Sequence, residues 1–174
     1  MSRQLIALAD AKATCARSLE IMADGSLADF EAVIHPEAIS LEAGGPPASR
    51  GQGPAAFHAI ASWLRGAFAD LRWEVHQTAA DSGLVVIHST WSGRHVRPFV
   101  TYDDRGAVAQ AMPPTGKTFA ATQSHWFRLA DGKIMEHWAN RDDLAMGRQL
   151  GWIPPGPGYL IRMALAGRRA RRDR

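Results

Sequence analysis

Strand patterns fill the second half of the chain and constrain its fold more than any other feature of the sequence. Two turn segments, Asp81-Ser82-Gly83 and Ala130-Asp131-Gly132, separate successive patterns by only a few residues, which predicts two hairpins and therefore antiparallel neighbours. The four predicted strands are Leu71–Ala79, Leu84–His95, Thr118–Leu129 and Lys133–Asn140. We therefore expect a strongly curved antiparallel sheet.

Helical periodicity dominates the residues before this sheet. Apolar residues recur every three or four positions from Ser2 to Ala23, which is the period of a helix with one buried face. Ser26 can cap a second, short helix, and Gly53-Pro54 begins a third after a short strand at residues 38–42. Helices that cover one face of such a sheet form an α+β fold. The sequence therefore predicts a cone-shaped barrel that is covered by its N-terminal helices and open at one end.

Three further segments are assigned by their composition. Between His95 and Lys117 the strand pattern is lost, and a long connection inside a compact domain is often functional, so we expect a lid or pocket rim. A last helix is expected from about Asp142 to Leu150, where Gly151 stops it. A chain of 174 residues falls in the size range of one domain. We place this domain at residues 1–160 and expect a basic, frayed tail at residues 161–174.

The charge of the chain is concentrated at its end. Residues 162–174 contain six arginines and one aspartate, a formal charge of +5, whereas the whole chain carries +3 and the remainder −2. A short basic terminus lacks the set of held phosphate contacts that nucleic-acid binding requires, so we expect no nucleic-acid partner. Cys15 is the only cysteine, which excludes an intrachain disulfide and a cysteine-based zinc site and suits a reducing cytoplasm. No run approaches 18 apolar residues, so we expect no membrane span.

Four short motifs carry a family resemblance. They are Leu64–Leu71 (LRGAFADL), Pro113–Lys117 (PPTGK), Asp131–Trp138 (DGKIMEHW) and Gln149–Gly151 (QLG), with Gly93-Arg94-His95 between the first two. In this order they resemble the SnoaL-like polyketide cyclases, which have the nuclear-transport-factor-2-like fold. The resemblance implies a cone-shaped barrel that is commonly dimeric and needs neither a metal nor an organic cofactor. It also implies a small, mostly apolar substrate such as a polyketide, whose ring the best-known members close by an intramolecular aldol reaction.

The residue that acts as the base in such cyclases is absent from its place in this chain. In the family, an aspartate directly after a Glu-x-Trp triplet takes a proton from a substrate carbon, and a histidine on the neighbouring strand assists. By position the histidine corresponds to His125, but the aspartate falls on Ala139. A positioned base contributes about 10²- to 10⁴-fold to such a reaction, and a methyl group cannot replace it. Either another residue is the base, the reaction differs, or the barrel binds its ligand without catalysis.

His125 and His137 are the first candidates for the missing chemistry. Because side chains alternate across a strand, a three-residue turn at residues 130–132 would place His125 opposite His137 on one face of the sheet. A two-residue turn would break this pairing. Two adjacent imidazoles could titrate near neutrality and serve as acid and base. The alternative is that they are hydrogen-bonded residues of the cavity wall.

Other residues are secondary candidates. Asp142 could take part in catalysis, but its position before a helix also suits an N-cap. His95 could bind substrate at the pocket mouth or hold a loop. The remaining substrate-binding candidates, placed on the cavity side by periodicity, are Phe57, Phe119, Gln123, Phe127 and Ala139. The other histidines lack a second ligand at metal-binding spacing, so we expect no metal site.

Trp126 and Trp138 alternate to the opposite face of the sheet, where we expect a sheet-on-sheet homodimer interface. Two functional hypotheses follow from the sequence. The first is a cofactor-independent enzyme that performs acid–base chemistry on a carbonyl compound, with His125 and His137 as the working pair. The second is a non-catalytic protein that binds a lipophilic small molecule, which Ala139 favours.

Overall fold

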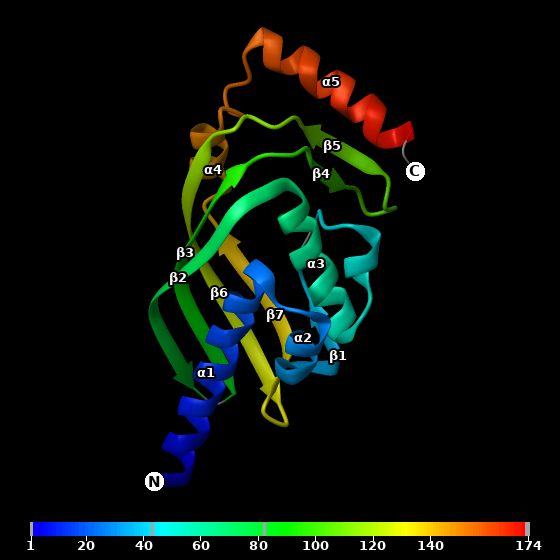
Figure 1. Cartoon of the computed structure of the whole chain (residues 1–174). Helices are drawn as coiled ribbons and strands as arrows, with labels where there is room; N and C mark the ends of the chain where they lie inside the picture. The colour runs from blue at the N-terminus through cyan, green and yellow to red at the C-terminus, as the bar shows by residue number, and fades with distance from the viewer. Residues whose placement is uncertain (1, 43, 82, 173–174) are drawn as a thin grey trace.

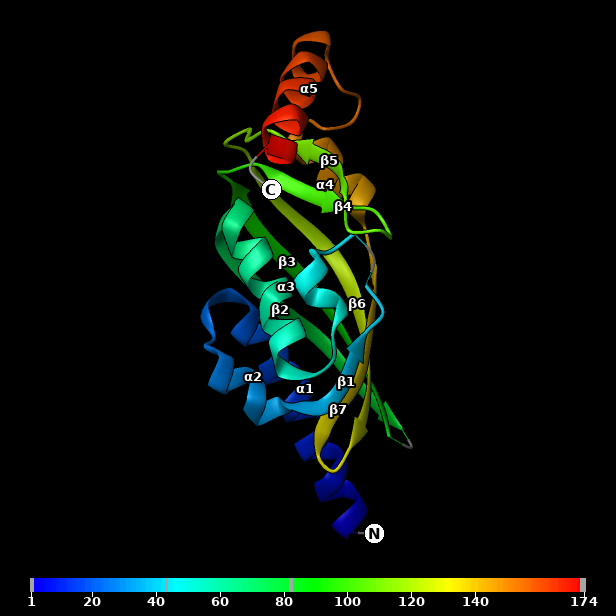
Figure 2. The same cartoon turned by 90° about the vertical axis from the view of Figure 1, so that its right-hand side faces the viewer.

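The computed structural model of the chain describes residues 2–42, 44–81 and 83–172. A five-stranded sheet curves around three helices, which cover one of its faces (Figures 1 and 2). The helices are α1 (Ser2–Asp24), α2 (Leu27–Val33) and α3 (Gly53–Ala67), with a short 3-10 helix at Pro47–Arg50. The strands of this sheet are β1 (Ile34–Ser40), β2 (Phe68–Asp81), β3 (Leu84–His95), β6 (Thr118–Ala130) and β7 (Lys133–Arg141). The α+β fold with N-terminal helices over a curved sheet is confirmed.

The sheet is mixed, so the expectation of a purely antiparallel sheet is wrong for one edge. Its strand order is β1-β7-β6-β3-β2, and the four strands predicted from the sequence are antiparallel neighbours. Strand β1 instead pairs with β7 in parallel, with Ile34 beside Ile134 and Ser40 beside His137. After β1 the chain passes through α3 and enters the sheet again at the opposite edge, as β2. The antiparallel strands β2, β3, β6 and β7 then lead back to β1, so that β7 ends beside β1 and runs in the same direction. This long-range pairing leaves no local signal in the sequence.

The hairpin between β6 and β7 differs from the expected one in a way that matters for the site. Its turn has two residues, Asp131 and Gly132, which both have positive φ angles (51° and 75°), as a tight hairpin turn requires. A bulge follows between Arg128 and Leu129, where β7 contributes one extra residue. The resulting register pairs His125 with Ala139 and not with His137. The predicted direct pairing of the two histidines is therefore wrong, although the bulge returns His137 to the face of His125.

Helix α3 is held against the other helices by polar as well as apolar contacts. The Arg65 guanidinium donates to the carbonyl oxygens of Met22 and Gly25, both at 2.9 Å, at the end of α1. A capping box at Ser26 and Asp29 begins α2, as a serine at that position predicted. Below these helices, one apolar cluster fills the space against the sheet: Cys15, Leu19, Ile21, Phe30, Val33, Ile34, Ala38, Phe57, Ala61, Val85, Ile87, Phe127 and Ile134.

The second half of the chain adds elements that the sequence did not predict. Residues 96–117 contain a hairpin of β4 (Phe99–Tyr102) and β5 (Val108–Met112), where we expected an irregular connection. Residues 161–172 belong to helix α5 (Pro157–Arg172), where we expected a frayed tail. This helix lies along β5 (Figure 1), with Tyr159 buried and its hydroxyl 3.4 Å from the carbonyl oxygen of Pro113. Helix α4 (Asp143–Leu150) matches its prediction.

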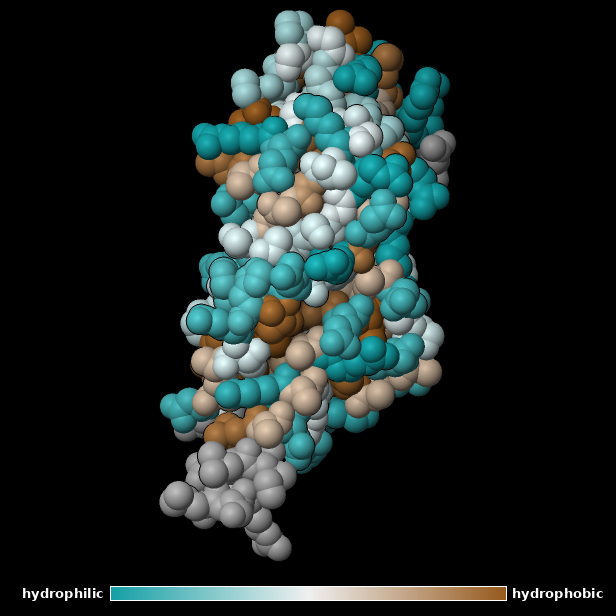
Figure 3. Space-filling view, turned by 60° about the vertical axis from the view of Figure 1, so that its left-hand side comes forward, coloured by the Kyte–Doolittle hydropathy of each residue, from teal (hydrophilic) through white to brown (hydrophobic). Residues whose placement is uncertain are grey.

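The surface of the molecule is mixed in character. In the view of Figure 3, hydrophobic residues gather in a recess near the middle and hydrophilic ones surround them. Across the described residues, every helix is too short or too polar to cross a membrane.

Gly53 sets the position of α3 and gives a direct test of the fold. Its φ angle is +76°, and a Cβ atom there would lie 2.4 Å from the carbonyl oxygen of Pro36. Because both the backbone conformation and the space exclude a side chain, we expect Gly53→Ala to lower the free energy of unfolding by about 1–3 kcal/mol in urea titrations. Gly66→Ala in the same helix is the control: a Cβ there meets no atom within 4 Å, so it should stabilise the protein by about 0.5–1 kcal/mol. Equal effects of the two substitutions would contradict this account.

Candidate active site

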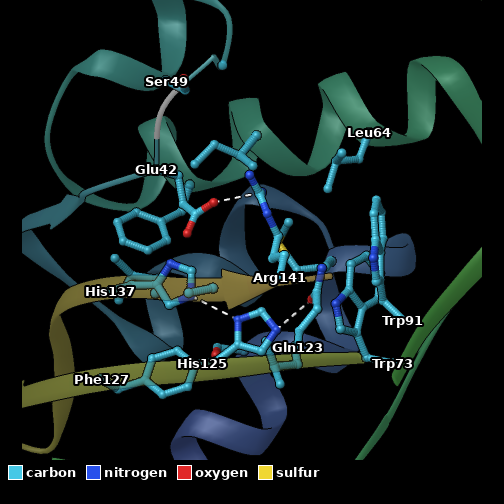
Figure 4. Close-up of a pocket in the computed structure, with 18 of the residues that line it drawn as sticks. Glu42, Ser49, Leu64, Trp73, Trp91, Gln123, His125, Phe127, His137 and Arg141 are labelled. Atoms are coloured by element: carbon cyan, nitrogen blue, oxygen red, sulfur yellow. Dashed lines mark hydrogen bonds and ion pairs between the residues drawn. The ribbon is translucent and has the colours of Figure 1, made fainter. Parts of the chain in front are cut away.

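A cavity lies between the helices and the concave face of the sheet, and its wall is mainly apolar. Helices α1 and α3 supply Leu19, Met22, Phe57, Ile60 and Leu64, and the sheet supplies Trp73, Trp91 and Phe127. Polar side chains gather in one part of the wall: Glu42, Gln123, His125, His137 and Arg141 (Figure 4). Concave apolar sites with a few converging polar groups are the usual form of small-molecule sites.

A hydrogen-bonded chain of three side chains crosses the floor of the cavity. His125 Nε2 lies 2.8 Å from Gln123 Oε1, and His125 Nδ1 lies 3.0 Å from His137 Nε2 (Figure 4). Since the amide oxygen of Gln123 can only accept, His125 carries its proton on Nε2 and accepts at Nδ1. His137 therefore donates from Nε2, which leaves its Nδ1 as an acceptor. Gln123 and His125 are buried and His137 is half-buried, so His137 is the more accessible end of the chain.

Both imidazoles are neutral at pH 7, which corrects the expectation that they titrate near neutrality. Burial lowers the pKa of His125 well below its ordinary value, and the electrostatic effects of the neighbouring His137, when that ring is protonated, and of Arg141 lower it further. Burial, followed by the charge of Arg141, lowers the pKa of His137 to about 4. The pair can therefore accept or relay a proton, but neither ring is protonated at neutral pH.

Glu42 and Arg141 form an ion pair in the same part of the wall, and the sequence analysis missed both residues. Arg141 Nη1 lies 2.7 Å from Glu42 Oε2, and the Glu42 side chain is only 16% exposed. Burial raises the pKa of the Glu42 carboxyl, although Arg141 and the backbone N–H of Ala139 oppose this. The predicted last strand ends at Asn140. One more residue would have included Arg141, which alternation places on the same face as His137 and Ala139. Glu42 follows β1, whose pairing with β7 the sequence did not reveal.

The structure places the other candidates in two groups. Phe57, Gln123, Phe127 and Ala139 line the cavity, in the positions that periodicity indicated. His95, Phe119 and Asp142 do not line it.

His95 and Phe119 belong to a separate packed region farther along the sheet. His95 is fully buried, with its ring against Phe68 and Trp152, and Phe119 packs on Phe68 and Trp91. Alternation identified the correct face of their strands, but helix α4 and Trp152 close that end of the sheet. The placement of His95 at the cavity mouth is therefore wrong.

Asp142 acts as the N-cap of α4, the alternative that the sequence left open. Its carboxylate accepts a hydrogen bond from the backbone N–H of Ala145 at 2.9 Å, and the residue is exposed. Among the residues that the structure describes, no group of three or more histidine, cysteine or acidic side chains is placed to hold a metal ion.

The lowered pKa values of the histidines predict an acid-labile fold. A neutral buried imidazole stabilises the folded chain fully above about pH 6.5, where the unfolded chain is also neutral, and loses this contribution as the pH falls toward 4. We therefore expect the free energy of unfolding to fall between pH 7 and pH 4.5 in urea titrations. The fall should be smaller in His137→Gln and unchanged in His88→Gln, whose ring is exposed. Parallel curves for the wild type and His137→Gln would contradict the lowered pKa of His137.

Comparisons with known proteins identify the family of the chain. The SnoaL-like polyketide cyclase family model matches residues 13–150. Aklanonic acid methyl ester cyclase DnrD of Streptomyces peucetius is 35% identical over 107 residues, which are 61% of this chain and 67% of DnrD. Nogalonic acid methyl ester cyclase of Streptomyces nogalater is 31% identical over 131 residues, which are 73% of this chain and 87% of that protein. The crystal structure of IdmH from Streptomyces antibioticus superposes with a TM-score of 0.62 at 25% identity and covers 81% of this chain and 98% of IdmH. The chain therefore belongs to the SnoaL-like polyketide cyclase family.

Proposed function

We propose that this protein closes a ring in a polyketide by cofactor-independent acid–base chemistry on a carbonyl group. The hydrogen-bonded chain of Gln123, His125 and His137, which opens into an apolar cavity, is the observation that carries the proposal. Two relatives that are at least 31% identical are named aklanonic acid methyl ester cyclase and nogalonic acid methyl ester cyclase, and this supports the same class of reaction here.

His137 is the histidine that we expect to contact the substrate. Its Nδ1 accepts a hydrogen bond from a hydroxyl or enol group of the substrate, while its Nε2–H is held by His125. His125 in turn is fixed by Gln123, so the tautomers and ring orientations are set before the substrate binds. This pre-organisation reduces the entropy that the substrate must lose to reach a reactive position.

Turnover of two candidate substrates tests the proposal. Aklanonic acid methyl ester and nogalonic acid methyl ester should be converted to ring-closed isomers of unchanged mass, which chromatography with mass detection separates. His137→Ala should lower kcat/KM by about 10²- to 10⁴-fold because the positioned acid–base group is lost. His88→Ala on the opposite face of the sheet is the matched control and should retain wild-type turnover and stability. Undiminished turnover in a folded His137→Ala variant would remove His137 from the mechanism.

A binding protein without catalysis is the second candidate, and Ala139 is the observation that favours it. An alanine lies where the family places its aspartate, opposite His125. If neither methyl ester is converted and the purified protein releases a lipophilic ligand chemically unchanged, this second function is the correct one.

We also propose a homodimer formed through the outer face of the sheet. There Trp126 and Trp138 stack with ring centroids 6.1 Å apart, and the Arg128 guanidinium lies 5.9 Å from the Trp138 ring. Trp138→Glu should convert a dimer of 18.9 kDa subunits into a monomer in light-scattering measurements, because a carboxylate would be buried in the interface. A wild-type protein that is monomeric at assay concentration would overturn this proposal.

The reaction is proposed to take place in the cytoplasm. Cys15, the only cysteine, is free and buried, and burial raises the pKa of its thiol to about 12. A thiol of this kind needs no oxidising compartment.

A further inference from the structure

We propose that Glu42 is the base that removes the carbon-bound proton of the substrate, in place of the aspartate that Ala139 has replaced, and that Arg141 positions it. This inference rests on the proposed ring closure and assigns the step that the two neutral histidines leave open. It concerns a residue outside the family's motif, because Glu42 comes from the segment after β1 and the usual aspartate comes from β7.

The position of the Glu42 carboxylate is the first argument. The backbone N–H of Ala139 donates a hydrogen bond to it, so the carboxylate lies against the residue whose side chain would carry the family's base. Figure 4 shows Glu42 and His137 on the same side of the cavity, with Arg141 reaching across to Glu42. Since β1 pairs with β7, with Ser40 beside His137, the chain leads from that pairing directly to Glu42. A carboxylate thus occupies the neighbourhood of the missing one, supplied by the adjacent strand.

The surroundings of Glu42 suit a base better than those of His137. The pKa of Glu42 is raised overall, because burial outweighs the opposing effects of Arg141 and the Ala139 N–H, whereas burial and Arg141 both lower the pKa of His137. The apolar wall of the cavity strengthens this difference because it removes water from the carboxylate. Of the two groups, the carboxylate is therefore favoured to take a proton from carbon.

Arg141 both positions Glu42 and can contact the substrate in this scheme. Its Nη1 holds Glu42 Oε2 at 2.7 Å, and its Nε lies 3.5 Å from an oxygen of the exposed Asp143. A guanidinium has five N–H donors, and two contacts leave further donors for the substrate. These can stabilise the negative oxygen of an enolate next to the carbon that loses its proton.

The reaction balances without any further reagent. Glu42 takes the proton from a carbon next to a carbonyl group, and the electron pair of the broken C–H bond forms the enolate. The enolate carbon then attacks a second carbonyl carbon of the same molecule, which forms the ring bond and leaves an alkoxide. The Glu42 carboxyl returns its proton to that alkoxide. Substrate and product are isomers, and the carboxylate is regenerated.

An assay with an unrelated model substrate tests the base separately from the ring closure. The Kemp elimination of 5-nitrobenzisoxazole needs only a base in an apolar site: the base takes the C3 proton, the N–O bond breaks and a coloured nitrophenolate forms. We expect Glu42→Gln to reduce the protein-dependent rate by at least about tenfold. Glu20→Gln is the matched control, because Glu20 is an exposed residue of α1 that pairs with Arg17, and it should retain the full rate. An equal rate in Glu42→Gln and the wild type, or no protein-dependent rate in the wild type, would overturn the proposal.

A second test moves the carboxylate from position 42 to position 139 and uses aklanonic and nogalonic acid methyl esters as substrates. Glu42→Gln should lower kcat for ring closure by about 10²- to 10⁴-fold with a small change in KM, and adding Ala139→Asp should restore part of that loss. Should Glu42→Gln prove poorly folded in thermal unfolding, Glu42→Asp keeps the carboxylate and should retain measurable elimination. Full ring closure in Glu42→Gln would overturn the role of Glu42 and leave the cyclase function intact. A third outcome separates the two proposals. If Glu42→Gln loses the Kemp elimination but the wild type closes no ring in either methyl ester, Glu42 is still the base of the site and the proposed polyketide substrate is wrong.

Discussion

The bulge that adds one residue to β7 near its start determines the chemistry of the whole cavity. The two-residue turn before it would, in a regular hairpin, put His125 on the face of Trp138 and turn His137 outward, because a shift of one residue exchanges the faces of a strand. With the bulge, His137 and Ala139 face the helices, and the tryptophans face outward. The contact between the two histidines is therefore a consequence of backbone register, and it does not depend on the side chains themselves.

Electrostatics then separates the tasks of the polar residues. Burial, assisted by the Arg141 guanidinium, lowers the pKa of both imidazoles and keeps the rings neutral. At Glu42 the same guanidinium opposes the effect of burial and so favours the ionised carboxylate. The histidines thus become fixed hydrogen-bonding groups, and the negative charge is concentrated on a single side chain. A site of this kind separates orientation of a substrate from removal of its proton.

Local patterns were sufficient for most of the fold. Alternation and turn residues identified the four long strands and helix α4 to within a few residues, and the motifs identified the family. The parallel pairing of β1, the hairpin of β4 and β5 and the helix α5 depend on contacts between distant segments or on weak patterns, which periodicity cannot detect. The same distinction applies to the site: periodicity found His125, His137 and Gln123, but Glu42 depends on a pairing between strands far apart in the sequence. His95 was misplaced because alternation gives the face of a strand and not the extent of a cavity.

The parallel edge strand has a consequence for how the proposed site assembles during folding. Strand β1 is bound to the sheet along one side only, through β7, and the two strands come from opposite ends of the chain. Contacts between such distant segments are costly in chain entropy and tend to form late in folding. A chain in which the four antiparallel strands have already assembled would contain the hydrogen-bonded histidines but no carboxylate beside them. If Glu42 has the proposed role, recovery of ring closure during refolding would therefore report the docking of a single edge strand, separately from the formation of the core.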